Sequence, residues 1–459
     1  MMKIFSRFCV ILLCVLILIS LSLPVFADDA APFTVDAKAA LLLDLNSGRI
    51  LYSQNADEKL YPASLTKIMT CMLALENSFL DQVVTVSSEA LEGLGEDSSS
   101  AGLLAGEELS MRELLYCVMI SSANEACNVV AEAVSGSVAS FVDLMNQRAS
   151  ELGCTNTHFV NPHGLHDENH YTTARDLSII TKAALKYDSF VTICTAAEHT
   201  VPATNLSGPR ELYTTNYLIS NHTTGIYYYP KAKGIKTGFT TPAGRCLVTM
   251  ASGNGMNLLS IVMGAATVQQ PDGNWLMKSF PETKALLEYG FSHFKEYTLV
   301  SPLNPLGKLP VRLSANTESV VYAPASTVTA ILPTDYDELL LRTVINLENP
   351  EGIDAPVRKD QVLGSVEVYY DHELLGSSEL LAISEVQRSA AEQVIHQTNS
   401  FFHSKAWKWI LFSLIFLAML FAVIYVLRVY RAREDRRRRS GKQKLDQVRQ
   451  KLREELDDQ

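Results

Sequence analysis

Hydrophobic and polar residues follow two different periods along the first two thirds of the chain. Ile68 to Leu75 is an apolar run without glycine or proline, which predicts a buried helix. Cys246 to Ala251 and Met256 to Gly264 are apolar runs joined by Gly253-Asn254-Gly255, a pattern typical of an antiparallel hairpin. Because helical patterns are enclosed by strand patterns at both ends, residues 28–295 are predicted to form an α/β (α+β) domain, a sheet with helices on its faces.

The pattern changes after residue 295. Short alternating apolar runs are separated by Pro, Asn, Asp and Gly, and Tyr370-Asp371-His372-Glu373 is typical of a hairpin turn. Residues 296–384 are therefore predicted to form a small all-β domain. Residues 385–408 are polar, show no evident core and are predicted to be a stalk. The short runs are Val320 to Tyr322, Val328 to Leu332, Leu339 to Ile345 and Val366 to Tyr370.

Both ends of the chain carry long apolar segments. Lys3 and Arg7 precede the run Phe8 to Leu23, and Val25-Phe26-Ala27 has the small-x-small form of a cleavage site, so residues 1–27 are predicted to be a secretory signal peptide. An uncleaved anchor is the alternative.

The second apolar segment predicts a membrane span. Trp409 to Leu427 contains nineteen residues without a charge, just enough to cross a bilayer core as a transmembrane helix. Aromatic residues such as Trp407 and Tyr430 near its ends suit a membrane-interface belt, and dense arginine directly after it marks the cytoplasmic side. The expected arrangement is a single-pass protein of the cell membrane, with an extracytoplasmic catalytic domain and a basic cytoplasmic tail at 428–459.

Charge divides the chain in the same way. The tail carries twelve basic and seven acidic side chains, whereas the chain as a whole has a net charge of −11. Residues 28–427 are left with about −18, which argues against nucleic acid or anionic lipid as a partner of that part. The arginines of the tail are interpreted as topology signals in preference to an RNA-binding patch. Leu445, Val448 and Leu452 have helical spacing, but the sequence identifies no partner of the tail.

Candidate chemistry starts with Ser64-Leu65-Thr66-Lys67. Pro62-Ala63 and the apolar run from Ile68 place Ser64 at the start of a predicted helix, where backbone N–H groups are unpaired. Lys67 is one turn further on and lies on the same face, so its amine can reach the Ser64 hydroxyl. A lysine can accept a serine proton only if its pKa is lowered, by burial or by a second cation.

Two more motifs follow in the chain. Ser110 and Glu113 predict a capping box that opens a helix, and Ser122-Ala123-Asn124 is expected in the turn after that helix. Lys236-Thr237-Gly238 lies in a predicted edge strand. Strand alternation places Lys236 and Gly238 on one face, with Thr237 opposite unless a local twist re-aims it. Lys236 is the candidate second cation.

Each motif alone is weak, but these three in this order are the combination found in penicillin-interacting serine enzymes. The chain resembles the low-molecular-weight penicillin-binding proteins of the D-alanyl-D-alanine carboxypeptidase type (peptidase family S11) over about residues 35–384. Asn161-Pro162-His163-Gly164-Leu165 and Thr172-Thr173-Ala174-Arg175-Asp176 resemble the family's segment between the second and third motifs, and Ala39 to Ser53 resembles its opening hairpin. Ala123 stands where many members have glycine. The apolar span also departs from the amphipathic C-terminal helix that members often use.

The resemblance implies a role for each motif residue. Ser64 would be the acylated nucleophile, Lys67 its general base and Ser122 the relay of a proton to the leaving amine. The implied substrate-binding residues are Asn124, Lys236, Thr237, Gly238 and Phe239, with the backbone N–H groups of Ser64 and Phe239 as the oxyanion hole. The implied partners are peptidoglycan stem peptides ending in D-Ala-D-Ala, together with β-lactams. No cofactor is implied.

Two alternative functions remain. A class A β-lactamase shares the motifs but needs a further carboxylate for deacylation, and the segment Leu152 to His166 has no Asp or Glu, although Asp167 and Glu168 follow at once. A penicillin-sensing or wall-binding module with a spent site is the other alternative, against which the intact motifs argue.

The remaining reactive side chains give weaker signals. Six cysteines outside the signal segment lie mostly in apolar runs and are expected to be buried, although a disulfide is possible. His163, His166 and His170 suggest a metal, but their spacing fits no standard set of ligands, and no metal is expected.

Overall fold

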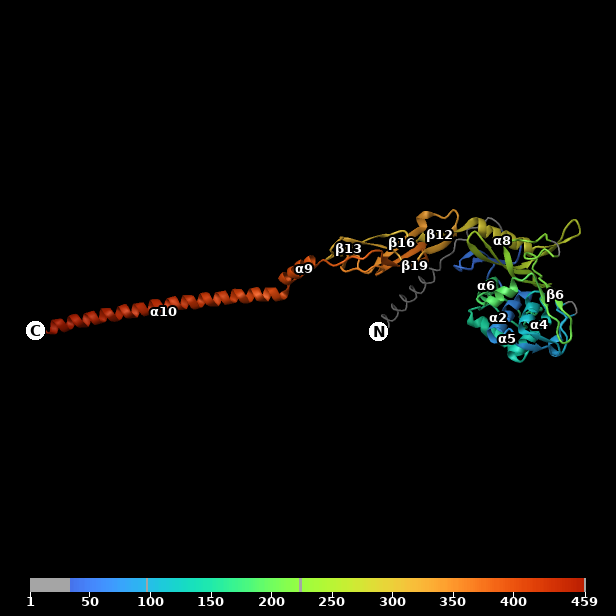
Figure 1. The fold of residues 1–459 in the computed structure, drawn as a ribbon, viewed down its shortest axis with the longest axis horizontal. Coiled ribbons are helices and arrows are strands. Elements are labelled where there is room, and N and C mark those ends of the chain that lie inside the picture. Colours follow the sequence, from blue (N-terminus) through green and yellow to red (C-terminus); the bar gives the residue numbers. More distant parts are fainter. Residues whose placement is uncertain (1–33, 96–97, 223–224, 458–459) are drawn as a thin grey trace, which may run out of the picture. The chain divides into compact units, whose positions relative to one another are not determined.

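The computed structural model describes residues 34–95, 98–222 and 225–457. The predicted signal peptide therefore lies outside the described residues. The chain divides into two compact units (Figure 1). The first runs to Tyr297 and includes Ala330–Asp337, and the second comprises Thr298–Thr329 and the residues from Glu338 onward.

A five-stranded antiparallel sheet forms the centre of the first unit, in the order β2-β1-β9-β8-β7. The predicted hairpin is present as β8 and β9, with Asn254 and Gly255 at positive φ in its turn. The strand that carries Lys236 is β7, and it lies at the edge of the sheet as predicted. The strands are β1 (Ala39–Asp44), β2 (Ile50–Gln54), β7 (Ala232–Thr240), β8 (Gly244–Gly253) and β9 (Met256–Ala265).

Both faces of this sheet are buried. Leu41 and Leu43 of β1 pack into a core shared with the helical layer, whereas Ala40 and Leu42 pack into a second core with α8 (Ser279–His293). In Figure 1, α8 lies on one side of the sheet and the helical layer lies on the other. The helical layer contains α2 (Lys67–Asn77), α3 (Met111–Met119), α4 (Asn124–Ser135), α5 (Val138–Glu151), α6 (Ala174–Ala184) and α7 (Asp188–Cys194).

Short elements complete the first unit. Three two-stranded sheets are formed by β3 (Val83–Thr85) with β4 (Glu108–Ser110), β5 (Glu198–Val201) with β6 (Arg210–Tyr213), and β10 (Thr267–Gln269) with β11 (Trp275–Met277). Two 3₁₀ turns are η1 (Ala63–Thr66) and η2 (Glu89–Leu91). The predicted cap is present, since the Ser110 side chain accepts a hydrogen bond from the Glu113 backbone N–H at the start of α3.

The second unit contains a six-stranded sheet in the order β16-β18-β19-β14-β13-β17. Its core includes Val320, Val366 and Leu380, all fully buried, and the predicted turn at Asp371 and His372 connects β18 to β19 with both residues at positive φ. The strands are β13 (Gly307–Arg312), β14 (Ser319–Pro324), β16 (Leu341–Leu347), β17 (Ile353–Asp354), β18 (Val362–Tyr370) and β19 (Glu373–Ala382), with the 3₁₀ turn η3 (Glu338–Leu340). β12 (Phe294–Val300) and β15 (Val328–Pro333) each run across the boundary between the units.

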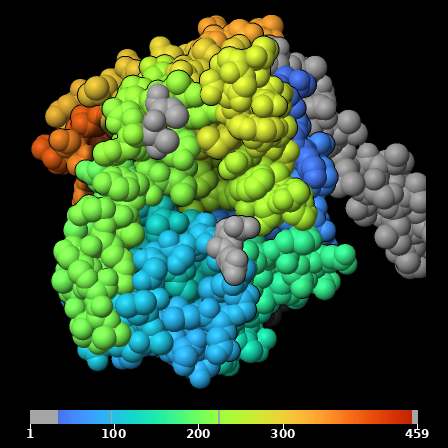
Figure 2. All heavy atoms as spheres, turned by 90° about the vertical axis from the view of Figure 1, so that its right-hand side faces the viewer, coloured from blue at the N-terminus to red at the C-terminus, as the bar shows by residue number. Residues whose placement is uncertain are grey.

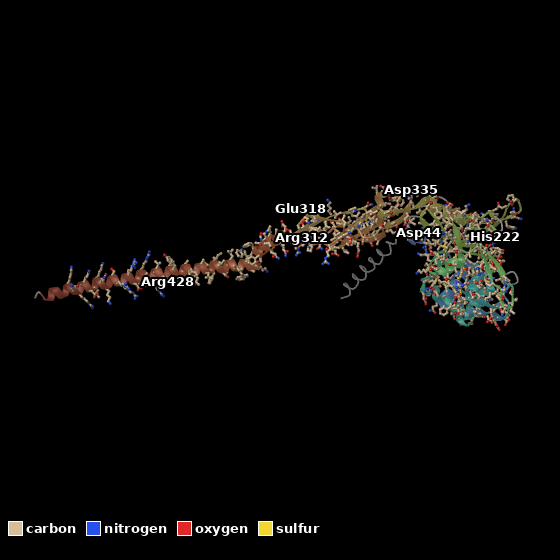
Figure 3. All side chains as sticks on the ribbon, viewed as in Figure 1. Asp44, His222, Arg312, Glu318, Asp335 and Arg428 are labelled. Atoms are coloured by element: carbon tan, nitrogen blue, oxygen red, sulfur yellow. The ribbon has the colours of Figure 1, made fainter. Side chains whose placement is uncertain are left out.

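Two helices follow the β-rich sheet. The segment predicted to be a stalk contains a helix, α9 (Ala390–His403), none of whose residues is buried. α10 (Lys405–Asp457) then continues through the apolar segment and into the basic tail. Among the described residues, α10 is the one unbroken helix that is long and apolar enough to cross a membrane. Figure 3 shows Arg428 on this helix, where the nitrogen-bearing side chains of the tail begin.

Candidate active site

Ser64 lies where the edge strand β7 meets the turn η1. The sequence predicted Ser64 at the start of an α-helix, but the structure places it in a 3₁₀ turn, and α2 begins only at Lys67. Gly238 of β7 permits the contact, because a Cβ there would lie 2.9 Å from the Pro62 carbonyl oxygen and 3.0 Å from the Ser64 backbone nitrogen. Ser64 remains partly exposed. Glycine at this position therefore lets the strand approach the candidate nucleophile.

The Lys67 ammonium joins three segments that are far apart in the sequence. Its Nζ is 2.9 Å from the Ser64 Oγ, 2.7 Å from the Asn124 Oδ1 and 2.8 Å from the His163 carbonyl oxygen. Lys67 has 0% exposed surface. Three acceptors thus hold the amine against the serine hydroxyl, with no freedom to reach solvent.

Burial sets the protonation of Lys67. Removal from water disfavours the ammonium and lowers the pKa of Lys67 to about 8, partly opposed by the nearby Cys127 and Glu125. The predicted second cation, Lys236, is 1% exposed. Burial, together with the charge on Lys67, lowers the pKa of Lys236 well below its usual range. Burial is therefore the main cause of the lowered pKa of Lys67.

The second motif enters the site from a strained turn. Ser122 has a φ of 62° and is 4% exposed. A residue other than glycine in this region costs about 1–3 kcal/mol and persists only where its surroundings hold it there. Here the flanking backbone is anchored, since the Ala123 N–H donates to the Cys117 carbonyl and the Asn124 N–H donates to the Ser99 carbonyl.

The third motif supplies two side chains to opposite faces of β7, as alternation predicted. Lys236 faces the helical core and donates to the Thr237 carbonyl at 3.1 Å. The Thr237 hydroxyl shares a hydrogen bond with the Thr215 hydroxyl. The Asn216 side chain donates to the Gly234 carbonyl at 2.7 Å. The sequence analysis did not predict that Thr215 and Asn216 contact the strand of the third motif. Polar residues between two strands are common, so nothing in the sequence marked these two.

Phe239 ends the motif at the surface. Its side chain is 49% exposed, and the Arg245 guanidinium lies 4.1 Å from the ring centroid. Because Phe239 and Arg245 are paired across β7 and β8, they project from the same face of the sheet. Figure 2 shows a hollow between the yellow-green segments that include β7 and the cyan-blue segments that include the second motif.

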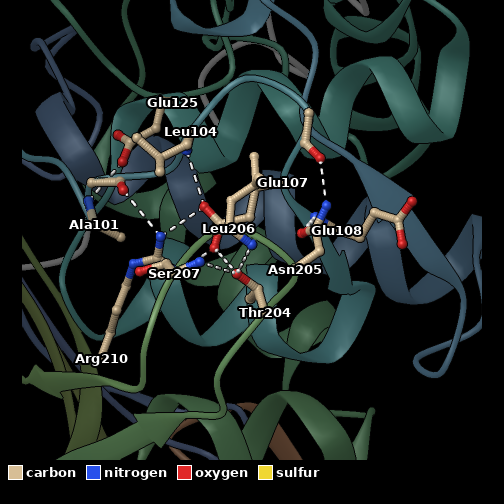
Figure 4. Close-up of polar contacts among 12 residues, drawn as sticks. Ala101, Leu104, Glu107, Glu108, Glu125, Thr204, Asn205, Leu206, Ser207 and Arg210 are labelled. Atoms are coloured by element: carbon tan, nitrogen blue, oxygen red, sulfur yellow. Dashed lines mark hydrogen bonds and ion pairs between the residues drawn. The ribbon is translucent and has the colours of Figure 1, made fainter.

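A buried ion pair supports the segment behind the second motif (Figure 4). Glu107 has a fully buried side chain, accepts two hydrogen bonds from Arg210 at 2.6 and 2.7 Å, and also accepts from Thr204 and from the Leu104 N–H. These hydrogen bonds hold the pKa of Glu107 below its usual value against the opposing effect of burial.

Glu125 extends the same support toward the site. One carboxylate oxygen accepts from the Ser100 hydroxyl at 2.7 Å and from the Ala101 N–H at 2.6 Å, while the other is buried without a partner. Residues 99–107 are thereby tied both to α4 and to β6. Sequence analysis assigned no role to Glu107 or Glu125.

Two of the three histidines considered as metal ligands, His163 and His170, contact residues of the first motif. Burial lowers the pKa of His163 to about 3 and that of His170 to about 4, so both rings are neutral at neutral pH. His170 Nδ1 accepts from the Val160 N–H, and its Nε2 is 2.8 Å from the Thr66 hydroxyl. In the described ranges, no group of three or more His, Cys, Asp or Glu side chains could hold a metal. The six described cysteines are free and buried.

Comparisons with known proteins agree on one family. A profile of the D-alanyl-D-alanine carboxypeptidase family (peptidase S11) matches residues 26–267. D-alanyl-D-alanine carboxypeptidase DacF of Bacillus subtilis (strain 168) is 32% identical over 358 residues, covering 77% of this chain and 87% of the relative. DacC of Escherichia coli (strain K12) is 31% identical over 376 residues, covering 77% and 85%. The crystal structure of penicillin binding protein 5 from Haemophilus influenzae superposes with a TM-score of 0.56 at 29% identity, covering 78% of this chain and 99% of that one.

Proposed function

The chain belongs to the D-alanyl-D-alanine carboxypeptidase family, and we propose that it removes the terminal D-alanine from peptidoglycan stem peptides through an acyl-enzyme on Ser64. The observation that carries the proposal is the 2.9 Å contact between the Lys67 amine and the Ser64 hydroxyl, in a site that lowers the pKa of Lys67 to about 8. An amine with this pKa is partly neutral near pH 7 and can accept the serine proton.

Acylation follows from these positions. Lys67 Nζ takes the proton of the Ser64 hydroxyl while Oγ attacks the carbonyl carbon of the penultimate D-alanine. The backbone N–H groups of Ser64 and Phe239 would stabilise the oxyanion, and the contact between Gly238 and Ser64 supports a common site for them. Ser122 would pass a proton to the nitrogen of the departing D-alanine as the C–N bond breaks. Water then releases the shortened peptide.

Substrate recognition is assigned to the remaining motif residues. Lys236, beside Thr237, would attract the terminal carboxylate, and an anion there would favour the ammonium form that burial otherwise opposes. The Asn124 side chain, whose carbonyl oxygen is engaged by Lys67, retains its NH₂ group to donate to a peptide carbonyl. A β-lactam presents an acyl group and a carboxylate in a similar relation, so penicillins would acylate Ser64 as well.

The same proposal covers domain organisation and location. We assign residues 28–295 to catalysis, 296–384 to the β-rich domain and 385–408 to the stalk. Residues 409–427 would cross the membrane, with residues 428–459 in the cytoplasm and the catalytic domain outside. The apolar length of α10 and the arginines from Arg428 onward support this topology.

The test is D-alanine release from a defined pentapeptide by the purified full chain, with Ser64→Ala as the matched variant. Wild type should release D-alanine and form a covalent adduct with fluorescent penicillin, whereas Ser64→Ala should lose both by several orders of magnitude and still fold. Labelling of a folded Ser64→Ala variant would contradict the assignment. Labelling of wild type without D-alanine release would show a competent nucleophile that does not act as a carboxypeptidase. Absence of both in folded wild type would indicate a sensor or wall-binding module with a spent site.

Adduct lifetime distinguishes the β-lactamase alternative. Because residues 152–166 contain no Asp or Glu, we expect the penicilloyl adduct to survive far longer than one turnover of peptide. Mass spectrometry of the adduct over time measures this. Rapid recovery of free enzyme would favour a β-lactamase.

A further inference from the structure

A second cavity lies in the catalytic unit, and none of its lining residues belongs to the three motifs. It has a volume of about 510 Å³. It is bounded by the β1–β2 turn, the C-terminal end of α6, α7 and the ends of β7 and β8. Its apolar wall includes Leu45, Leu185, Val191 and Met250.

Three lysines converge on this cavity from two elements. Lys182 comes from the last turn of α6, Lys186 lies two residues past the end of that helix, and Lys233 comes from β7. The lining contains no Asp or Glu, and no carboxylate lies within ion-pair distance of any of the three amines among the described residues. Asp44, the last residue of β1, accepts two hydrogen bonds from Ser47 at one carboxylate oxygen, and its other oxygen is buried without a partner. We call this cavity the lysine pocket.

A purely structural role explains only part of the arrangement. The negative end of the α6 dipole would favour Lys182 and Lys186 at the helix C-terminus. It does not account for Lys233, which comes from a strand, nor for the omission of carboxylates from the lining in a region with a net charge of about −18. Three like charges around one cavity repel each other, and an anion between them would offset that repulsion.

The lysine pocket is separate from the catalytic cleft although one strand serves both. Lys233 and Lys236 are three residues apart on β7, roughly 10 Å along the strand. Between them, α7 closes over the strand, since a Cβ on Gly234 would lie 2.5 Å from the Cys194 carbonyl oxygen. A ligand in the lysine pocket would therefore leave Ser64 free to react.

The lining contains lysine and no arginine. Lysine is a regular phosphate ligand that acts as a compact point charge, whereas the planar fork of arginine gives the bidentate contacts that carboxylates and phosphates both accept. Asn257 and Ser252 line the same cavity and add polar side chains, and the apolar wall can contact methylene groups next to the charge. We propose that the lysine pocket binds a phosphodiester group that carries short polyol or acyl methylene segments.

The test uses the full chain in a neutral detergent, with its lysines converted to ¹³C-dimethyl-lysine, which keeps their charge. Glycerophosphoglycerol, a soluble phosphodiester, is titrated while the methyl resonances are followed by NMR. The variants Lys182→Gln, Lys186→Gln and Lys233→Gln assign the methyl resonances, because each variant lacks the resonance of the lysine that it replaces. We expect these three resonances to shift when the diester is added to the wild-type protein. Glutarate, a dicarboxylate, should bind less tightly. In the triple variant, affinity for the diester should fall about tenfold or more, the combined effect of three partly exposed charge contacts.

The matched control is the triple variant Lys295→Gln, Lys308→Gln and Lys359→Gln, which removes the same charge elsewhere. It should bind the diester as wild type does, and penicillin labelling of Ser64 should be unchanged in both triple variants. Equal loss in the two triple variants, or no shift at the three lysines, would overturn the proposal. Absence of penicillin labelling in the wild-type protein would instead count against the proposed catalytic function.

The source of the phosphodiester is resolved by a second arm. If the ligand is a lipid headgroup, nanodiscs that contain phosphatidylglycerol should shift the same three resonances, and nanodiscs of phosphatidylcholine alone should not. If it is a soluble polyol chain, an oligomer of glycerol phosphate should bind more tightly than glycerophosphoglycerol. This difference should be the same whichever nanodisc holds the protein. An absence of shift with every phosphodiester would refute the lysine pocket as a phosphodiester site.

Discussion

Lys67 makes acylation dependent on pH. In the proposed mechanism its neutral form is the base, and burial lowers its pKa to about 8, so the rate of penicillin acylation should rise as the pH increases through about 8. Glu125 raises the pKa of Lys67 by its negative charge. In Glu125→Gln, we therefore expect the midpoint of the rising limb to move to lower pH. Stopped-flow measurement of acylation from pH 6 to pH 10 checks this.

The control for this prediction is Glu58→Gln, which removes an exposed carboxylate. Its pH profile should match that of wild type. A profile of Glu125→Gln that falls in amplitude but keeps its midpoint would show that Glu125 acts only by holding Ser100 and Ala101 in place.

Gly238 is the second residue whose replacement gives a sharp prediction. A methyl group there would meet Pro62 and the Ser64 backbone at 2.9–3.0 Å, so β7 and η1 must separate in Gly238→Ala. Because a displacement of about 1 Å at a reacting group can cost about 100-fold in rate, we expect penicillin acylation to fall by that order. Gly208→Ala is the control, since nothing lies within 4 Å of its Cβ position. A wild-type rate in Gly238→Ala would show that the contact is not required.

At the level of secondary-structure elements, the Glu107–Arg210 pair ties the segment before β4 to β6. Arg210→Met would leave the Glu107 carboxylate buried without its cation, which typically costs about 3–5 kcal/mol. We expect a decrease of that order in the free energy of unfolding, measured by urea denaturation. In Arg175→Met, which breaks the exposed pair with Asp57, the decrease should stay below about 1 kcal/mol.

The pH dependence of this pair has a definite sign. The pKa of Glu107 is lower in the folded state than in the unfolded chain, so its contribution to stability is present above the unfolded pKa. That contribution is lost as the pH falls through the folded pKa. The difference in stability between wild type and Arg210→Met should therefore shrink in acid. A constant difference down to pH 3 would contradict this account.

For the whole molecule, the testable property is topology. A protease added outside intact cells should digest the catalytic domain and spare a C-terminal epitope tag. The apolar part of α10 is long enough to span a bilayer, and the arginines that follow it on the same helix resist translocation. Permeabilised cells provide the control, since the tag should become accessible there. Cleavage of the tag in intact cells would mean that residues 409–427 lie on the outer surface.

Features that depend on neighbouring residues could be predicted from the sequence. The cap at Ser110, the turn at Asn254-Gly255 and the turn at Asp371-His372 each depend on a few adjacent side chains and backbone angles. The order of the three motifs was enough to identify the family, and the nineteen uncharged residues from Trp409 were enough to predict a span. Such patterns are local, so chain order alone carries them.

Contacts between distant elements could not be predicted in this way. Lys67 and His163 are 96 positions apart, and Glu107 and Arg210 are 103 apart, yet each pair is in direct contact. The small polar residues at 215 and 216 and the carboxylate of Glu125 have no motif that marks them. Their roles, and the pKa of Lys67, depend on how tightly the helical layer packs against the sheet, because burial and the approach of elements far apart in the chain set these energies.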